Sequence, residues 1–428
     1  MARSPQAPPM NGPRPATGMA PVAILALGVF AVGTGEFVLA GLLPMLVDAF
    51  DVSVAGAGQV VTVFALTCAV SGPVLTALTA AWARRTVLLT ATLIYLLGSA
   101  GSAMADTYSQ LLAAQVIAAA GVGLYIPNAS ATAAALVPPR LQGRAIALVV
   151  TGFTAAVAFG APLGTALGGL LDWRATLWFA TLLATVGLTG VALAVPRRVE
   201  VPDAGGFRDR LRPLGDRRVL MLLATTLVAF TAVFVPYTYI GVVYAPATGG
   251  SGLALAALMM VGGIAGAVGN LSAGSLTDRW GGSRVVAVAL VLLAVGLLLV
   301  PLSTTTLFLA VPVVAFYAAA SFAITTPQQH RIISLNPAAA PVLLSLNQSV
   351  LYLAIAASGV VGAGGIEALG ARYVTLVAAA AALAALGLSV LAHRMVLRPA
   401  ATDTPASPAS TNSADSAGPA LHEGERGR

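Results

Sequence analysis

The feature that most constrains this chain is a series of long apolar runs, which occupies most of its 428 residues. A helix needs about 20 apolar residues to cross roughly 30 Å of hydrocarbon, and twelve runs are long enough. The chain is 58% hydrophobic and only 9% charged, whereas a soluble domain has about 25% charged residues. Polar side chains cannot cover so much apolar surface, so lipid must surround it. We therefore predict an all-α membrane protein with twelve transmembrane helices.

The predicted spans form two groups of six. The first six are 21–45, 57–79, 86–104, 110–134, 144–171 and 176–195. The second six are 219–244, 253–276, 284–302, 305–326, 341–364 and 373–395.

The longest internal connection, 196–218, lies between the two groups and carries seven arginines. We interpret it as a cytoplasmic linker between a six-helix bundle at 19–195 and a second bundle at 219–396. The terminal segments 1–18 and 397–428 are polar and rich in proline or small residues, a composition typical of disordered tails. We expect both tails to be cytoplasmic.

The distribution of basic residues indicates the orientation in the membrane. All 22 basic residues are arginine, and 20 of them lie in segments that are cytoplasmic if the termini are inside the cell. Only Arg174 and Arg372 then lie outside. Such an excess in cytoplasmic loops is typical of multi-pass membrane proteins. It explains the net charge of +7 without a nucleic-acid partner, and the lysine-free, alanine-rich composition suggests a bacterial cytoplasmic membrane.

The two halves of the chain match at an offset of 198 residues, as in an internal repeat. The matched pairs are Leu78 and Leu276, Thr79 and Thr277, Trp82 and Trp280, Pro139 and Pro337, Gly164 and Gly362, and Arg174 and Arg372. Two repeated six-helix halves are an architecture of membrane transporters, with the substrate site between the halves near the middle of the bilayer.

The strongest local motif is GSLTDRWGGSR at 274–284, between the eighth and ninth spans. It resembles the loop signature G-x-L-x-D-R-x-G-x-[RK] of the major facilitator superfamily. The resemblance implies two pseudo-symmetric six-helix bundles and a loop that acts as a conformational latch. The residues that would form the latch are Gly274, Asp278, Arg279, Gly281 and Arg284. The alternative is an ordinary hydrophilic loop with cytoplasmic charges.

Of the charged positions of this signature, the equivalent loop of the first half keeps only Arg84 and Arg85. Small or uncharged residues replace its other conserved positions: Thr76, Ala80, Ala81 and Ala83. We therefore expect the loop of the second half to carry more of the latch function.

Glu36 is the one acidic residue that we place well inside a predicted span. Intramembrane carboxylates are by default functional, and burial lets a carboxyl group bind and release protons near neutral pH. The surrounding strings, GTGEFVLAGLLP (33–44) and TVFALTCAVSGP (62–73), resemble the arabinose-efflux-permease and chloramphenicol-efflux branch of the superfamily. That branch implies export in exchange for protons. The alternative is a structural Glu36 that is hydrogen-bonded to a neighbouring helix.

Glycines recur along the fifth span, in the stretch GFTAAVAFGAPLGTALGG (152–169). This stretch resembles the antiporter motif of the family in a Gly-x-Pro-x-Gly variant, and the alternative is close packing of small residues. The motif residues are Gly152, Gly160, Pro162, Gly164 and Gly168, of which Pro162 can also bend the helix.

Several uncharged polar side chains within the spans are candidates to line a substrate cavity, although each could instead join helices. They are Thr34, Gln115, Tyr125, Asn128, Tyr237, Tyr239, Asn270, Asn347 and Gln348. Gln115 stands where the family pattern usually has an arginine that is thought to assist proton coupling.

Nothing in the sequence indicates catalysis, a cofactor or a metal site. The three histidines lie at loops, helix ends or tails, the single Cys68 excludes an intrachain disulfide, and no phosphate-binding loop is present. We predict a monomeric carrier that exports small amphipathic compounds by proton antiport. The alternatives are a sugar or nucleoside exporter, a proton-coupled nutrient symporter, or a membrane sensor without transport.

Overall fold

The computed structural model describes residues 18–197, 199 and 212–397. Almost all of the predicted tails, 1–18 and 397–428, and much of the predicted linker 196–218 lie outside these ranges. Within them the chain has twelve helices long and apolar enough to cross a membrane. The predicted all-α class and the twelve spans are therefore confirmed.

The first half of the chain contains α1 to α7. Its elements are α1 (Met19–Phe50), α2 (Val54–Leu78), α3 (Arg84–Ala103), α4 (Tyr108–Ala135), η1 (Pro139–Leu141), α5 (Gln142–Ala155), η2 (Ala156–Gly160), α6 (Ala161–Leu170) and α7 (Trp173–Ala194). The elements η1, α5, η2 and α6 together make the fifth span.

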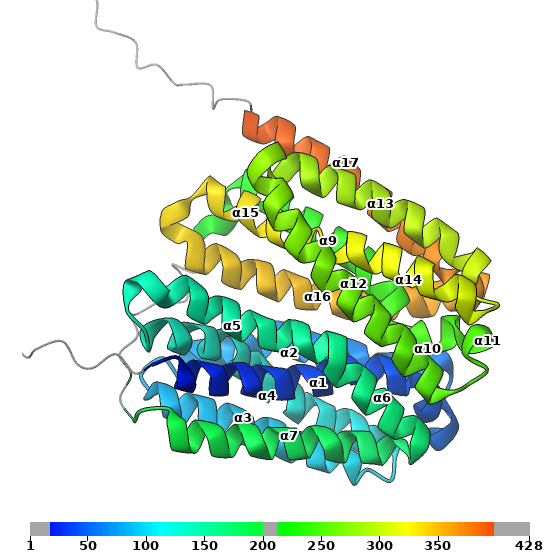
Figure 1. Cartoon of the computed structure of the whole chain (residues 1–428), viewed down its shortest axis with the longest axis horizontal. Coiled ribbons are helices and arrows are strands. Elements are labelled where there is room, and N and C mark those ends of the chain that lie inside the picture. Colours follow the sequence, from blue (N-terminus) through cyan, green and yellow to red (C-terminus); the bar gives the residue numbers. More distant parts are fainter. Residues whose placement is uncertain (1–17, 198, 200–211, 398–428) are drawn as a thin grey trace, which may run out of the picture.

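The second half begins with the short η3 (Arg212–Gly215). It continues with α9 (Arg217–Thr238), α10 (Ile240–Val243), α11 (Ala245–Thr248), α12 (Gly252–Trp280), α13 (Gly282–Ser303), α14 (Leu307–Phe322), α15 (Thr325–Leu335), η4 (Pro337–Ala339), α16 (Ala340–Leu369), η5 (Ala371–Tyr373) and α17 (Val374–Leu397). In Figure 1 the two halves form two bundles side by side. Across the junction, α2 packs against α16, and α6 packs against α12.

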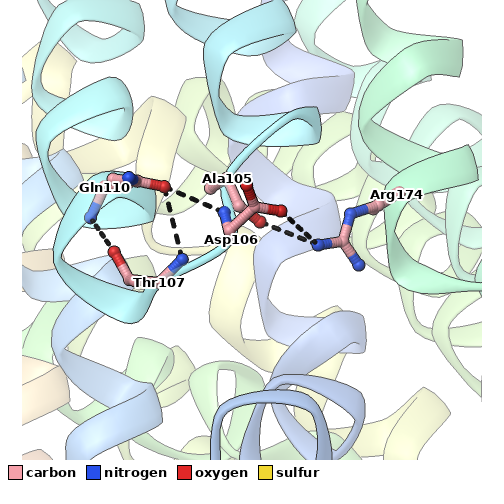
Figure 2. A network of polar contacts seen from close by, with 5 residues as sticks. All are labelled: Ala105, Asp106, Thr107, Gln110 and Arg174. Carbon is pink, nitrogen blue, oxygen red and sulfur yellow. Dashed lines mark hydrogen bonds and ion pairs between the residues drawn. The ribbon is translucent and has the colours of Figure 1, made fainter.

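Local sequence signals set where several helices begin. Thr107 accepts a hydrogen bond from the Gln110 backbone N–H at 3.3 Å, and the Gln110 side chain in turn accepts from the Thr107 N–H at 3.4 Å. This reciprocal pair is a capping box, and Figure 2 shows it at the start of α4. Asp172 caps α7 in a simpler way, by accepting from the Ala175 N–H at 2.7 Å.

The two repeat-equivalent arginines make equivalent contacts. Arg174 Nη2 donates to the Ala105 carbonyl at 2.8 Å and lies 3.7 Å from the Asp106 carboxylate, as Figure 2 shows. In the other half, Arg372 Nε donates to the Pro301 carbonyl at 2.9 Å. Each arginine thus ties the start of the last span of its half to the chain at the end of the third span. The internal repeat that the sequence indicates therefore extends to these side-chain contacts.

Exchanging Arg174 for glutamine is expected to lower the apparent unfolding temperature of the purified protein. The hydrogen bond from its guanidinium to Ala105 is worth about 1–3 kcal/mol. Asp106 is 88% exposed, and exposed ion pairs contribute about 0–1 kcal/mol. Asp106→Asn should therefore leave the unfolding temperature nearly unchanged, which thermal unfolding in detergent would check. Equal losses in both variants would contradict this assignment.

Two spans differ from the straight helices that the sequence suggests. The fifth contains a π-helical segment at Ala156–Gly160, which ends two residues before Pro162. Proline lacks an N–H and its ring clashes with the preceding turn of an α-helix, and a π segment widens that turn. The tenth span continues past the predicted end at 326, because the polar helix α15 extends it to Leu335. That predicted boundary is wrong because the TTPQQHR stretch lowers the local hydropathy.

The two bundles touch closely at the end of the molecule opposite to the end at which α1 begins. A Cβ on Gly169 would lie 2.7 Å from the Gly252 Cα, so the backbones of α6 and α12 are in contact there. Tyr239 reaches from the second half to Gly58 of α2, where a Cβ would lie 2.1 Å from its hydroxyl oxygen. Only residues without a side chain permit such approach, so these glycines close this end.

Candidate functional site

Glu36 lies in the middle of α1, at the junction of the two bundles. Its side chain is 8% exposed. Tyr352 of α16, in the other half, donates a hydrogen bond to Glu36 Oε2 at 3.3 Å. Glu36 Oε1 has no hydrogen-bond partner among the described residues. The carboxyl group is thus buried and only partly satisfied, and its one hydrogen bond crosses between the halves.

Two small cavities adjoin this position. One, of about 20 Å³, is lined by Glu36 itself together with mainly apolar residues of α1, α2, α9 and α16. The other, of about 30 Å³, is lined mainly by α9, α12 and α14. Three aromatic residues, Phe37, Phe234 and Tyr237, line both cavities. These three residues, here called the aromatic wall, therefore separate the Glu36 cavity from its neighbour.

The aromatic wall is held by ring contacts and one hydrogen bond. Phe37 and Tyr237 pack edge to face with centroids 5.9 Å apart, and Tyr237 meets Phe234 in the same way at 6.1 Å. Phe153 of α5 packs on the other side of Phe37 at 5.1 Å. The Tyr237 hydroxyl donates to the Phe37 carbonyl at 3.3 Å. The wall thus joins α1 of one half to α9 of the other.

A third cavity, of about 70 Å³, lies among α2, α4 and α16, nearer the end at which α1 begins. Its lining includes Cys68, Gln348 and Tyr352. Tyr352 therefore connects this cavity to Glu36, because it lines the cavity and donates a hydrogen bond to the Glu36 carboxyl group.

Of the predicted cavity residues, Tyr237 and Gln348 line these three cavities. The structure places the other seven away from them, buried or partly buried within the bundles: Thr34, Gln115, Tyr125, Asn128, Tyr239, Asn270 and Asn347. Most satisfy their polar groups between or within helices. Tyr239, for example, donates to the Gly359 carbonyl at 2.6 Å, and Asn270 accepts from the Thr326 hydroxyl at 2.8 Å.

The two signature loops differ in the contacts that they make. In the first half, Arg84 donates to Asn128 Oδ1 at 3.0 Å and Arg85 donates to the Ala192 carbonyl. In the second half the motif ends α12, and Gly281 turns the chain into α13 with a φ of 80°. The side chains of this loop that carry charge are exposed and form no ion pair within the part of the chain that the structure describes: Asp278, Arg279 and Arg284. In this structure, the charged side chains that make polar contacts thus belong to the signature loop of the first half, which we expected to contribute less to the latch.

The four motif glycines of the fifth span, Gly152, Gly160, Gly164 and Gly168, lie against α1. A Cβ on Gly152 would meet the Ala26 carbonyl oxygen at 2.2 Å, and one on Gly160 would meet Thr34 Oγ1 at 2.0 Å. One turn and two turns further on, Gly164 and Gly168 face α1 at Val38 and Leu42 in the same way. The motif therefore seats the fifth span on the helix that carries Glu36.

A buried polar network in the second half is absent from our sequence-based predictions, apart from Asn347. Arg331, 7% exposed, donates to Gln328 Oε1 at 3.0 Å and to the Ser389 hydroxyl and carbonyl at 2.9 and 3.1 Å. Gln328 donates to Thr226, which donates to Asn347. The network joins α9, α15, α16 and α17. Reading the tenth span as far as Leu335 would have placed Gln328 and Arg331 inside the bundle.

Removing the arginine of this network is expected to destabilise the protein. In Arg331→Met, the buried Gln328 Oε1 loses its donor, at about 1–3 kcal/mol for an unsatisfied group, and the Ser389 hydroxyl and carbonyl each lose one hydrogen bond. Arg394→Met, an exposed position of α17, serves as the control. The apparent unfolding temperature in detergent should fall for Arg331→Met alone, and equal values for the two variants would refute a stabilising network.

Comparison with known proteins agrees with this architecture. Residues 25–359 match the model of the Major Facilitator Superfamily. The Escherichia coli (strain K12) inner membrane transport protein YdhP is 31% identical over 87% of this chain and 96% of its own length. The Bacillus subtilis MFS-type transporter YbcL is 30% identical over 86% of the chain and 94% of its own.

A further relative carries a more specific name. The chloramphenicol resistance protein of Streptomyces lividans is 35% identical over 64% of this chain and 71% of its own. Among solved structures, the D-xylose-proton symporter superposes with a TM-score of 0.73 at 16% identity, covering 86% of this chain and 97% of that one. The nucleoside transporter NupG gives 0.71 at 12%, covering 87% and 98%. These two likenesses show the fold. The chain is therefore a multi-pass bacterial inner-membrane transporter rather than an enzyme, and it belongs to the major facilitator superfamily.

Proposed function

We propose that this protein exports small amphipathic organic compounds in exchange for protons, by alternating access between its two halves. The observation that carries the proposal is the position of Glu36. It is a buried carboxyl group at the junction of the bundles, and its hydrogen bond to Tyr352 joins one half to the other. A group in such a place can link its proton to the relative position of the halves.

The physical basis of this coupling is the difference between the two charge states of the carboxyl group. A charged carboxylate buried among apolar side chains with one hydrogen bond is strongly unfavourable. Protonation removes that penalty, so the state shown here, in which the carboxyl group is buried, favours the proton-bound form. When the halves part, water reaches Glu36 and the proton can leave. For antiport, that release occurs on the cytoplasmic side as the substrate enters from there, and Glu36 takes up a new proton on the other side after the substrate has left.

Two observations support an exported organic compound rather than a sugar. The central cavities are lined mainly by apolar and aromatic side chains, whereas a sugar needs hydrogen-bonding groups to replace its water. The relative from Streptomyces lividans is named for resistance to chloramphenicol. A sugar or nucleoside carrier, or a nutrient symporter, is the second candidate. The observation that favours this second candidate is that the chain shares the fold of the xylose and nucleoside transporters.

The exposed loop at 274–284 fits a latch that engages in the opposite state. Here the bundles are closed at the end where Gly169 meets Gly252. Asp278 and Arg279 lie at the other end of α12, exposed. We propose that they form cross-helix contacts when that end closes, that both termini are cytoplasmic, and that the carrier works as a monomer.

Expression in an efflux-deficient bacterial host tests export against import. The carrier should raise the inhibitory concentration of chloramphenicol and lower its accumulation in the cells, and a protonophore should reverse the lowered accumulation. Greater accumulation in cells that express the protein, or growth on a sugar that the host cannot otherwise take up, would instead establish the importer.

A further inference from the structure

The cavity of about 30 Å³ beyond the aromatic wall, here called the ring chamber, is lined by fourteen residues, and none of them is charged. Five are aromatic: Phe37, Phe234, Tyr237, Tyr317 and Phe322. Two of its three hydroxyl groups already donate to backbone carbonyls, Tyr237 to Phe37 and Ser321 to Tyr317 at 2.8 Å. The Tyr317 hydroxyl has no hydrogen-bond partner among the described residues. The chamber therefore offers rings, methyl groups and one unused hydroxyl.

We propose that the ring chamber binds the uncharged, ring-bearing body of the substrate, and that Glu36 is reserved for the proton instead of serving as the counter-ion of a cation. This specifies the substrate class of the function proposed above and rests on it. In the state shown, the chamber has room for about one or two water molecules. Substrate must therefore enter when the bundles part and α9, α12 and α14 move away from α1.

A cation would find little in this chamber to replace its water. Transfer of an ion away from water is strongly unfavourable unless an opposite charge receives it. Glu36 lies on the other side of the aromatic wall. Rings can attract cations through their faces, but three of the five rings of the chamber are already engaged in edge-to-face contacts with one another. The interplanar angle is 85° for Phe37 and Tyr237 and 89° for Phe234 and Tyr237.

Separation of the ring chamber from the Glu36 cavity determines how much net charge each transport cycle moves across the membrane. When an uncharged substrate leaves in exchange for a proton, each cycle moves one net positive charge inward. A cationic substrate exchanged for one proton would move none. The substrate can still affect Glu36, because Phe37 and Tyr237 line both the ring chamber and the Glu36 cavity. A bound ring that displaces the aromatic wall therefore changes the surroundings of the carboxyl group.

Equilibrium binding to the purified protein tests the substrate class without requiring transport. Labelled chloramphenicol and progesterone serve as uncharged ring-bearing probes, and tetraphenylphosphonium and ethidium as cationic ones. Saturable binding of at least one uncharged probe, not displaced by tenfold excess of either cation, is the expected result. Displacement by a cation as effective as that by the unlabelled probe, or failure of both uncharged probes to bind, would overturn the assignment.

A variant that fills the chamber locates the binding. A Cβ on Gly262 would lie 3.2 Å from Val314 Cγ1 and 3.8 Å from Ala318 Cβ, within the chamber lining. Gly262→Leu should weaken binding of the uncharged probe about tenfold or more. The control, Gly364→Leu, adds its side chain at an exposed position with no atom within 4 Å, and should bind like the wild type.

Unchanged binding in a folded Gly262→Leu protein would place the substrate elsewhere. If Gly262→Leu does not fold, the competition experiment on the wild type still decides the substrate class. Binding that meets these expectations without any proton movement would refute proton antiport and leave the ring chamber assignment intact.

Discussion

Replacement of Glu36 by glutamine is expected to abolish transport driven by a pH gradient while leaving exchange of substrate between the two sides intact. Glutamine has nearly the same shape and its amide oxygen can still accept the Tyr352 hydrogen bond, but it cannot bind or release a proton. The packing at the junction of the bundles is therefore retained and only the titration is lost. Proteoliposomes would show this as uphill accumulation at the level of protein-free vesicles, together with counterflow exchange close to that of the wild type.

The matched control is Glu367→Gln, which removes a carboxylate from an exposed position of α16. It should leave both uphill accumulation and counterflow unchanged. Uphill accumulation that survives in Glu36→Gln would move proton coupling to another group. Loss of counterflow as well as accumulation would make Glu36 a residue needed for substrate binding or for the movement of the bundles.

The second large effect is expected from a side chain placed where the backbones of the two bundles meet. A Cβ on Gly169 would lie 2.7 Å from the Gly252 Cα, and one on Gly252 would lie 2.6 Å from the Gly169 Cα. Backbone atoms cannot move aside as a flexible side chain can. Overpacking of this kind costs up to about 3 kcal/mol, which would shift the balance between the two states by roughly 100-fold. Gly169→Val should therefore disfavour the state closed at this end and slow transport.

Thiol labelling can detect that shift directly. Cys68 is buried, so a cysteine introduced at Ala40, which lines the Glu36 cavity and is 3% exposed, is a suitable reporter. An impermeant reagent applied from the end where Gly169 lies should label Ala40→Cys faster when Gly169→Val is also present. Gly364→Val should not change the rate. Equal labelling and equal transport in all three proteins would show that the glycine contact does not control closure.

The helices were predictable because each one carries its own signal. A run of apolar residues identifies the span at Met19–Phe50 without reference to any other part of the chain. The same logic failed for α15, whose buried Gln328 and Arg331 form hydrogen bonds with α9 and α17. In that place a low hydropathy reflects an internal network, which a count of apolar residues does not detect.

The site was predictable only in part, for a related reason. Glu36 stands out because an acidic residue inside an apolar run is unusual, and the sequence alone supplies that contrast. Its partner Tyr352 lies 316 residues away, and a tyrosine in a span is common, so no local pattern relates the two. The aromatic wall likewise joins Phe37 to Tyr237 across 200 residues. These pairings arise when two bundles dock, and neither bundle specifies them by itself.

Substrate-driven proton flux in proteoliposomes tests the central claim most directly. A pH-sensitive dye inside the vesicles would report lumenal pH while chloramphenicol or progesterone is added under an imposed pH gradient, with efflux of the labelled compound followed in parallel. Proton antiport predicts that the gradient collapses faster when substrate is present, and only in vesicles that contain the carrier. Movement of the labelled compound with no change in lumenal pH would contradict it.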